Sequence, residues 1–361
     1  MTAHPSLDDP TWLAAHDPQD MLGLVAKVPA FVADAAQRVA GVVPKEWRGQ
    51  IDRVVVIAMG GSAIGSELAA TLAQLEGTVP VTVVRDYSLP AYVGERTLVV
   101  GSSYSGNTEE TISAFSQAKG RTPYRLVIAS GGAIVETARA DKLPLFSLPT
   151  GIPPRTTMTH SFVGLAQILT DLELLPAQTP IDHVAATLER AGAALGPTVP
   201  TADNRAKQLA LALKDRLAIV IASEHLAPAA SRWKGELNEN GKSLAYPDLI
   251  PELLHNTILG LPHPAAAPRL VRFVLLTSPR YHARNQRRYA LFRPILTEAG
   301  HTWEDVVIAG QSRFEELLLA TQLSSATSTY LGLLNGVDPY DFETIEVFKR
   351  ALGPMLDEAR V

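Results

Sequence analysis

Short runs of apolar, β-branched residues alternate with amphipathic helical patterns along most of the chain. In the first half, the runs predict buried strands at residues 53–58, 79–84, 97–101, 124–129 and 144–148. Helical patterns separate the earlier strands, and longer ones predict helices at residues 66–75 and 157–174. Strands that alternate with helices are typical of an α/β fold, a mostly parallel sheet between two layers of helices.

The same alternation returns in the second half of the chain. It predicts strands at residues 217–222, 270–276 and 302–309 and helices at residues 226–240, 285–299, 314–334 and 342–356. We therefore expect an approximate duplication, two sheets sandwiched by helices in tandem, although no sequence repeat proves it.

A chain of 361 residues is long for one domain, so two domains are expected. Residues 1–48 read as an N-terminal helical arm, with a helical pattern over residues 20–39. Residues 49–176 form the first predicted domain, and residues 207–361 form the second with its C-terminal helices. Prolines, glycines and a modest helix at residues 184–195 mark residues 177–206 as a connection.

The amino-acid composition limits the kinds of molecule that the protein is expected to bind. Hydrophobic residues make up 46% and charged residues 19%, and the net charge of −5 leaves no basic face for nucleic acid. There is no cysteine, so disulfides, zinc ribbons and thiol nucleophiles are excluded. The first residues do not resemble a signal peptide, and no apolar run approaches the ~18 residues of a membrane span. We expect a cytoplasmic protein with a small-molecule ligand.

The stretch at residues 102–111 (SSYSGNTEET) joins a predicted strand to a predicted helix through hydroxyl side chains. A helix start offers unpaired N–H groups, and Ser103, Ser105 and Thr108 can add hydroxyl donors to a phosphate or carboxylate. The alternative is an ordinary helix cap, with Asn107 as the cap and Glu110 as its capping-box partner.

A glycine-rich turn at residues 59–65 (MGGSAIG) follows the first strand, and a helix is expected from Ser66. A dinucleotide fingerprint would need glycine where Ser62 stands, and a P-loop would need Lys-Ser/Thr where Ser66-Glu67 stand, so neither motif fits. Gly61 would let the backbone approach a ligand closely, and the Ser62 hydroxyl would point the same way. A tight turn with glycine for packing alone is the alternative.

These loops, together with residues 130–132 (SGG), follow strands of one predicted sheet. Ligands of such sheets bind at the carboxyl ends of the strands, so the loops should lie together around one ligand-binding position. Arg155 opens the next helix, where a cation opposes the helix dipole and a nearby anion would explain it. A surface carboxylate partner is the alternative.

Acid and base candidates lie in the second half. Glu239 falls in the last turn of a predicted helix, where the negative end of the dipole favours proton uptake and suits a general base. His255 stands among apolar neighbours. An ordinary solvated glutamate and a hydrogen-bonded histidine are equally compatible with these patterns.

Taken together, the motifs resemble the bifunctional phosphoglucose/phosphomannose isomerases, built from two sugar-isomerase (SIS) domains. The resemblance covers about residues 50–355 and rests on segments in the family's order: 59–62 (MGGS), 103–111 (SYSGNTEET), 130–132 (SGG), 154–155 (PR), 237–240 (LNEN), 251–256 (PELLHN) and 336–339 (GVDP). The chain departs from the family pattern after Arg155, where Thr-Thr-Met-Thr-His160 replaces a small apolar run, and at Ala58, Glu67 and Leu254.

The resemblance implies interconversion of glucose 6-phosphate or mannose 6-phosphate with fructose 6-phosphate through an enediol, without metal or other cofactor. By the resemblance, Gly61, Ser62, Ser103, Ser105 and Thr108 would bind the substrate phosphate. Glu239 would be the base, and Arg155 would stabilise the enediolate. His255, from the partner subunit of a homodimer, and Lys349 would assist ring opening. For Lys349, a solvated lysine on the last helix remains the alternative.

Two other hypotheses compete. A non-catalytic sugar-phosphate sensor would need an output module, and the N-terminal arm lacks a basic recognition helix. The isomerase part of an amidotransferase would need an N-terminal nucleophile such as cysteine, and the chain has none.

Overall fold

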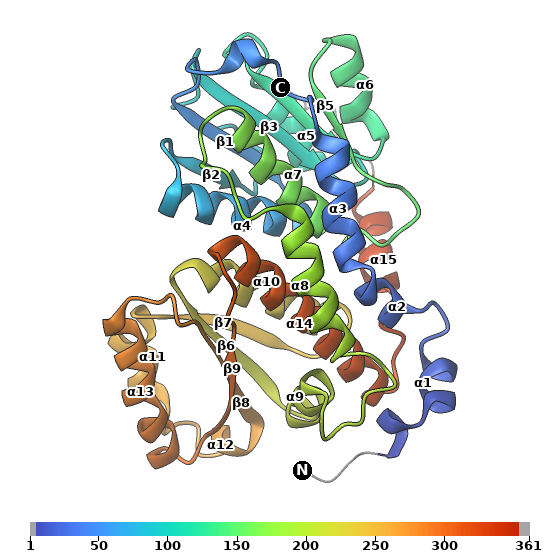
Figure 1. The fold of residues 1–361 in the computed structure, drawn as a ribbon, viewed down its shortest axis with the longest axis vertical. Coiled ribbons are helices and arrows are strands. Elements are labelled where there is room, and N and C mark those ends of the chain that lie inside the picture. Colours follow the sequence, from blue (N-terminus) through green and yellow to red (C-terminus); the bar gives the residue numbers. More distant parts are fainter. Residues whose placement is uncertain (1–4, 354–361) are drawn as a thin grey trace. The chain divides into compact units, whose positions relative to one another are not determined.

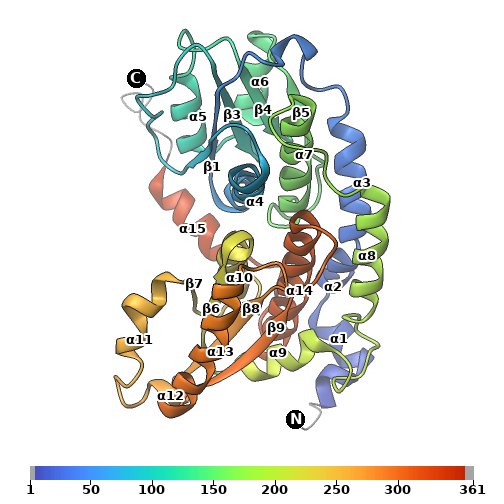
Figure 2. The same ribbon diagram turned by 60° about the vertical axis from the view of Figure 1, so that its left-hand side comes forward.

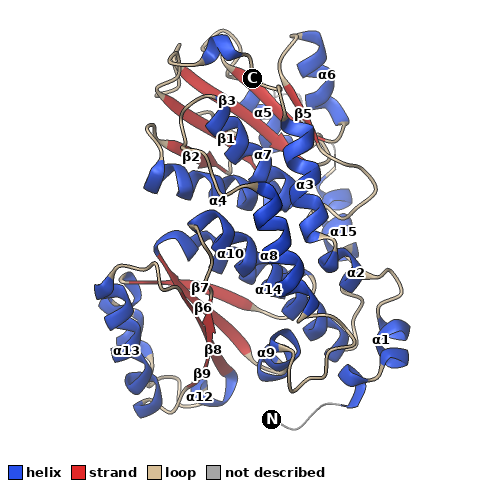
Figure 3. Ribbon diagram, in the orientation of Figure 1, coloured by secondary structure: helices blue, strands red, loops and turns tan. Residues whose placement is uncertain are grey.

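The computed structural model describes residues 5–353, and the chain divides into two compact units. One unit, here the first-sheet unit, contains residues 29–185 and the last helix, α15 (Glu343–Leu352). The other, the second-sheet unit, contains the N-terminal residues up to Val28 and residues 186–342. Each unit is built around one parallel sheet with helices on its faces (Figure 3).

The first sheet has five parallel strands in the order β2-β1-β3-β4-β5 (Figure 1). The strands are β1 (Arg53–Ala58), β2 (Val81–Val84), β3 (Thr97–Ser103), β4 (Arg125–Ala129) and β5 (Leu145–Ser147). The chain adds β2 on one side of β1 and then returns to add β3 on the other. The strand order therefore reverses between β1 and β3, the point at which open parallel sheets bind ligands.

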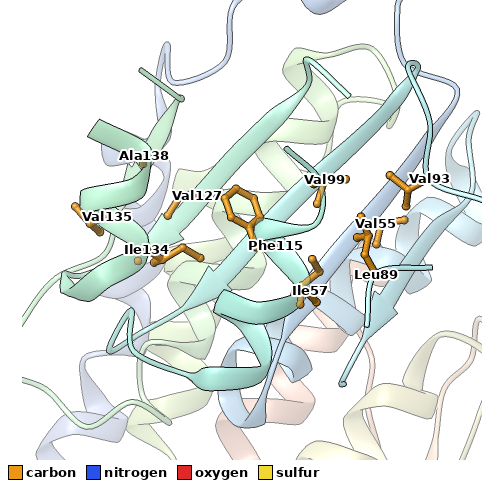
Figure 4. Close-up of a cluster of buried hydrophobic side chains, with 13 residues drawn as sticks. Val55, Ile57, Leu89, Val93, Val99, Phe115, Val127, Ile134, Val135 and Ala138 are labelled. Atoms are coloured by element: carbon orange, nitrogen blue, oxygen red, sulfur yellow. The ribbon is translucent and has the colours of Figure 1, made fainter. Parts of the chain in front are cut away.

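Helices cover both faces of this sheet because its strands are buried on both sides. The helices of the unit are α3 (Val28–Val39), α4 (Gly60–Glu76), α5 (Glu109–Ser116), α6 (Gly132–Ala140) and α7 (Met158–Asp171). On one face, Phe115 of α5 and Ile134 of α6 pack over Val99 and Val127 (Figure 4). Alternate strand residues thus form one core with α5 and α6, as side chains of a doubly covered sheet should.

The second sheet has four parallel strands in the order β7-β6-β8-β9. They are β6 (Leu217–Ser223), β7 (Ala245–Ile250), β8 (Val271–Thr277) and β9 (Thr302–Val307). This order repeats that of the first four strands of the first sheet, with β6 in the place of β1. The prediction of an α/β fold with two tandem sheets is confirmed.

Long helices pack on the second sheet, and the main ones are labelled in Figure 2. The longer helices of the unit are α8 (Ile181–Ala193), which begins in the first-sheet unit, α9 (Arg205–Leu213), α10 (Ala227–Glu239), α13 (Ala283–Glu298) and α14 (Arg313–Leu334). Trp233 of α10 is fully buried and donates from Nε1 to the Ala320 carbonyl of α14 at 3.0 Å. Phe292 of α13 meets Phe273 of β8 edge to face, with ring centres 6.3 Å apart. The two contacts fix α10 on α14 and α13 on the sheet.

Shorter helical segments complete the description. They are η1 (Pro5–Asp8), α1 (Pro10–His16), α2 (Met21–Ala26), η2 (Lys45–Trp47), η3 (Glu224–Leu226), η4 (Glu252–His255), α11 (Thr257–Gly260) and α12 (Ala267–Leu270). The predicted arm divides at Val28, because α1 and α2 group with the second sheet and α3 with the first. The predicted domain boundaries at residues 48, 176 and 206 stay predictions.

Two elements differ from the sequence expectation. Helix α4 begins at Gly60 and not at Ser66, so residues 60–65 form its first turns and not a loop. Strand β7 was not predicted, because Pro247 interrupts its pattern. Proline lacks an N–H donor and is tolerated on an edge strand, and β7 is the edge of the second sheet. The predicted last helix, residues 342–356, agrees with α15 up to Leu352, Gly353 is not helical, and residues 354–356 lie outside the described residues.

Within residues 5–353, no helix is both long enough and apolar enough to cross a membrane.

Candidate active site

The hydroxyl loop connects β3 to α5 in the first-sheet unit. Ser103 is the last residue of β3, and its Oγ lies 2.8 Å from Thr108 Oγ1. The Gly106 N–H donates to Ser103 Oγ at 3.1 Å, and the Asn107 N–H donates to Ser105 Oγ at 3.3 Å. In the Ser103–Thr108 pair one hydroxyl donates to the other, which leaves the second O–H available for a ligand.

The start of α5 has no side-chain cap among the described residues. Thr108 occupies the cap position without making a cap bond, and Asn107 Oδ1 instead accepts from the Ala133 N–H at 2.9 Å. The alternative of a capping box between Asn107 and Glu110 is therefore wrong. The N–H groups of the first turn of α5 remain available to an anion.

Helix α4 begins in the same way, directly after β1. Met59 is its cap residue and makes no side-chain cap bond within the described chain. Because β1 and β3 are neighbours where the strand order reverses, the two uncapped helix starts lie at the same end of adjacent strands. Two positive helix ends at one position favour a negatively charged ligand.

Glycines in α4 bring its first turns against the segment that precedes α7. A Cβ at Gly61 would lie 3.4 Å from the Pro154 carbonyl oxygen and 3.5 Å from Arg155 Cα. A Cβ at Gly65 would lie 2.9 Å from the Met158 carbonyl oxygen, too close for any side chain. Gly65 is thus required for packing, and the close approach places the Ser62 turn beside Arg155.

Arg155 lies in residues 149–157, between β5 and α7. Arg155 is only 4% exposed, so its guanidinium lies inside the protein, and the alternative of a carboxylate partner stays untested. Tyr104 Oη donates to the Ile152 carbonyl at 2.7 Å and so ties this segment to the hydroxyl loop. Tyr104 was not among the predicted site residues, because only the tertiary structure shows this contact.

The glycine loop after β4 interlocks with the hydroxyl loop. The N–H and hydroxyl of Ser130 both donate to the Tyr104 carbonyl, at 3.0 and 2.6 Å. A Cβ at Gly106 would overlap the Gly131 carbonyl oxygen at 1.7 Å, and Gly106 has a φ of +70°. Only glycine fits there, and the close contact keeps the hydroxyl loop in one conformation.

Glu239 is the last residue of α10, in the second-sheet unit. Beyond it, Lys242 Nζ donates to the carbonyls of Glu239 at 2.6 Å, Asp338 at 3.3 Å and Asp341 at 2.6 Å. The ammonium group therefore satisfies a carbonyl at the negative end of α10 and fixes the backbone of Glu239. Lys242 was missed, although a lysine just beyond a helix end is a recognisable signal.

A buried network lies one turn before Glu239. Glu236 is 1% exposed and accepts hydrogen bonds from Arg232 on its own helix and from Ser324 and Ser325 on α14. Burial raises the pKa of the Glu236 carboxyl, while Arg232 acts in the opposite direction. The network anchors the end of α10 that carries Glu239.

His255 and Lys349 are more exposed. His255 ends η4 and faces solvent in the isolated chain. Lys349 lies on α15 with its side chain 64% exposed, and its Nζ pairs with Glu346 Oε1 at 2.9 Å. Their predicted roles in ring opening stay predictions.

The predicted site residues fall into two groups. The first-sheet unit contains Gly61, Ser62, Ser103, Ser105, Thr108 and Arg155, and also Lys349 on α15. The second-sheet unit contains Glu239 and His255. In the described part of the chain, no three His, Asp or Glu side chains group in a way that could hold a metal ion.

Comparison with known proteins identifies the family. The chain is 35% identical to a bifunctional phosphoglucose/phosphomannose isomerase of Caldicellulosiruptor bescii, over 85% of this chain and 91% of that protein. It is 32% identical to the enzyme of the same name from Aquifex aeolicus, over 83% of this chain and 90% of that protein. The chain belongs to the bifunctional phosphoglucose/phosphomannose isomerase family. The proteins of this family are enzymes of the isomerase class.

Two further comparisons concern the C-terminal domain and the fold. Residues 202–352 match the family model for the C-terminal SIS domain of bacterial phospho-glucose isomerase, which covers the second sheet and α9 to α15. The C-terminal domain of glucosamine-fructose-6-phosphate aminotransferase from Francisella tularensis has the same fold. It superposes with a TM-score of 0.68 at 16% identity, covering 88% of this chain and 96% of that one.

Proposed function

We propose that this isomerase interconverts glucose 6-phosphate and mannose 6-phosphate with fructose 6-phosphate through an enediol and without a metal ion. The observation that carries the proposal is the anion site of the first-sheet unit. There, two uncapped helix starts and the hydroxyl pair of Ser103 and Thr108 lie at the reversal of strand order. A phosphate ester supplies the negative charge and the acceptor oxygens that such a site requires.

The remaining residue types fit the chemistry next to a carbonyl. Glu239 removes the proton from C2 of the open-chain aldose phosphate and returns it to C1, while the hydroxyl proton on O2 passes to O1, which leaves a ketose. The buried guanidinium of Arg155 stabilises the negative charge on the enediolate oxygen. Because the enediol has no stereocentre at C2, one site can serve both aldose epimers.

The exposed surface around His255 favours a homodimer in which this histidine completes the site of a second copy. Thr257 of α11 donates to Asp248 of β7 at 2.7 Å, so the segment that carries His255 lies against the edge strand. Large apolar side chains are exposed on this surface: Leu244 (67%), Tyr246 (54%), Leu249 (38%) and Leu259 (81%). Exposed apolar side chains on the strand and helix next to a residue with a proposed catalytic role suit burial against a second copy.

The first experiment gives fructose 6-phosphate to the purified protein and resolves the two aldose phosphates by NMR. We expect both products, at a rate that EDTA does not change. We also expect Glu239→Gln to remove turnover while inhibitor binding at the phosphate site persists. Binding without turnover in the unmodified protein would instead indicate the sugar-phosphate sensor.

A mixing experiment tests the dimer. Inactive Glu239→Gln and His255→Ala subunits, unfolded and refolded together, should regain activity because a mixed dimer contains one intact site. Random pairing predicts about a quarter of the unmodified activity. No recovery would place His255 and Glu239 of the same chain in one site. A cytoplasmic location stays a prediction.

A further inference from the structure

Helix α10 contains a glycine, Gly235, one turn before Glu239. Glycine in a helix interior is unfavourable relative to alanine, so each such glycine calls for a reason. Most helix glycines of this chain have one in their packing. A Cβ at Gly164 would lie 2.1 Å from the Phe146 ring, and a Cβ at Gly332 would lie 2.4 Å from the Asn240 carbonyl oxygen.

Gly235 has no such packing reason. Apart from its own helix backbone and chain neighbours, the one described atom within 4 Å of a Cβ at this position is Glu239 Oε1, at 4.0 Å. The position is partly exposed, and its φ is not in the left-handed region. An alanine would therefore fit sterically and adopt the same backbone.

The geometry of a helix explains why the space left by Gly235 lies beside the Glu239 carboxylate. A helical side chain leans toward the N-terminus and covers the turn before its own Cα. The Glu239 side chain accordingly leans over Gly235, and any side chain at residue 235 would occupy space next to Oε1. The missing side chain leaves that space empty on the side toward which the carboxylate leans.

We propose that Gly235 keeps open the space in which the C1–C2 edge of the sugar meets the Glu239 carboxylate, so that the substrate can approach the base. This inference rests on the proposed function, in which Glu239 is the base. A group that removes a proton from carbon must approach that carbon closely, and a methyl group beside its oxygen would displace the substrate.

The test is a size series at one position, Gly235→Ala and Gly235→Leu, assayed for fructose 6-phosphate turnover and thermal unfolding. Gly235→Ala should raise Tm by about 2 °C, because alanine favours the helix. It should also lower kcat/KM by about 10- to 100-fold, the effect of a substrate displaced by about 1 Å. Gly235→Leu should lower kcat/KM further. Ser231→Ala, one turn earlier on the same helix, is the matched control and should leave kcat/KM unchanged.

Inhibition by inorganic phosphate provides a second readout. Inorganic phosphate would bind at the hydroxyl loop and has no C1 or C2 to place beside Glu239. Its inhibition constant should therefore not change in Gly235→Ala. An unchanged kcat/KM in Gly235→Ala, or a lower Tm, would overturn the inference. Glu239→Gln is measured in parallel: if that variant keeps turnover, the proposed base is wrong, whereas if it is inactive and Gly235→Ala is fully active, only the role of Gly235 fails.

Discussion

The two sheets share one strand order, yet the carboxyl ends of their central strands have different chemistry. At the first sheet, β1 and β3 run into the uncapped starts of α4 and α5. Ser102, at the end of β3, adds a buried hydroxyl that has no hydrogen-bond partner among the described residues. This edge contains more donors than the protein itself satisfies.

At the second sheet, a buried carboxylate occupies the equivalent edge and accepts hydrogen bonds from the donors around it. Glu316 of α14 is fully buried there, and its Oε2 lies 2.6 Å from both Ser278 Oγ and His225 Nε2. The Gly310 N–H donates to Oε1 at 3.2 Å. The comparison teaches that a reversal of strand order offers a position for a ligand, and that the side chains at the strand ends decide whether the position remains open.

The largest predicted effect tests the edge of the second sheet that Glu316 occupies. Glu316→Ala should destabilise the protein by about 3–5 kcal/mol, because it leaves buried donors unsatisfied. Hydrogen bonds from His225, Ser278 and Gly310 outweigh desolvation and lower the pKa of Glu316. Its stabilising contribution is therefore present above the unfolded pKa, near the ordinary 4.5, and is lost as pH falls through the folded value. Urea unfolding at pH 7 measures the first effect, and a series continued through pH values below 4.5 measures the second.

Glu298→Ala on the exposed end of α13 is the control, and it should change the free energy of unfolding by less than about 0.5 kcal/mol. A Glu316→Ala protein as stable as this control would show that the hydrogen bonds of Glu316 do not stabilise this edge of the second sheet.

The second prediction concerns the edge of the first sheet, where the donors remain available to a ligand. Removing both paired hydroxyls in Ser103→Ala/Thr108→Val should raise KM for fructose 6-phosphate by about 10- to 100-fold, because hydrogen bonds to a charged phosphate are lost. The free energy of unfolding should fall by only about 1 kcal/mol. Steady-state kinetics and urea unfolding separate the two effects.

Thr122→Ala removes a hydroxyl at the opposite end of the same sheet, where Thr122 Oγ1 donates to the Thr97 carbonyl at 2.6 Å. It should cost stability and leave KM unchanged. If the Ser103→Ala/Thr108→Val protein behaved in the same way, the hydroxyl pair would be structural.

A third, smaller effect is expected at Tyr104. Tyr104→Phe removes the bond to the Ile152 carbonyl, so residues 149–157 should hold Arg155 less firmly. We expect kcat to fall by about 3- to 10-fold while KM changes less than twofold, because the hydroxyl loop itself is intact. Tyr92→Phe, at a half-exposed tyrosine of the same unit, should change neither constant. A rise in KM alone for Tyr104→Phe would contradict the assignment.

Local pattern was enough to predict most of the fold. The strands around Val55, Val99 and Val220 are runs of β-branched residues, a pattern that indicates a buried strand. The predicted helices follow from the helical spacing of their apolar residues. Strand β7 was missed because Pro247 argues against a strand unless its edge position is known. The early start of α4 was missed because glycines such as Gly65 suggest a loop until the contact with α7 is seen.

The site was predictable where one segment carries its chemistry. The hydroxyls of Ser103, Ser105 and Thr108 lie within a single turn, so the sequence alone places them together. Tyr104 and Lys242 act through contacts with residues far along the chain, Ile152 and Asp341, and no local pattern indicates such contacts. Gly235 required different information, namely that Glu239 Oε1 is the one described atom beyond its own helix backbone and chain neighbours within 4 Å of a Cβ placed there.

The smallest predicted effect compares the buried histidines of the two units. His160 Nε2 lies 3.1 Å from Asp34 Oδ2, and this carboxylate is 37% exposed and also binds Arg38, whereas the partner of His225 is fully buried. Burial lowers the pKa of His160, against the opposing effect of Asp34, so the folded state favours the neutral ring. The stabilising contribution is then complete above the unfolded pKa of about 6.5 and falls as pH drops from there toward the folded value.

His160→Gln keeps a donor toward Asp34 and does not titrate, so its Tm should fall less than that of the unmodified protein between pH 7.5 and pH 5.5. The exposed His16→Gln should not alter this pH dependence. Identical pH profiles for the unmodified and His160→Gln proteins would show that His160 does not contribute to the acid sensitivity of the first-sheet unit.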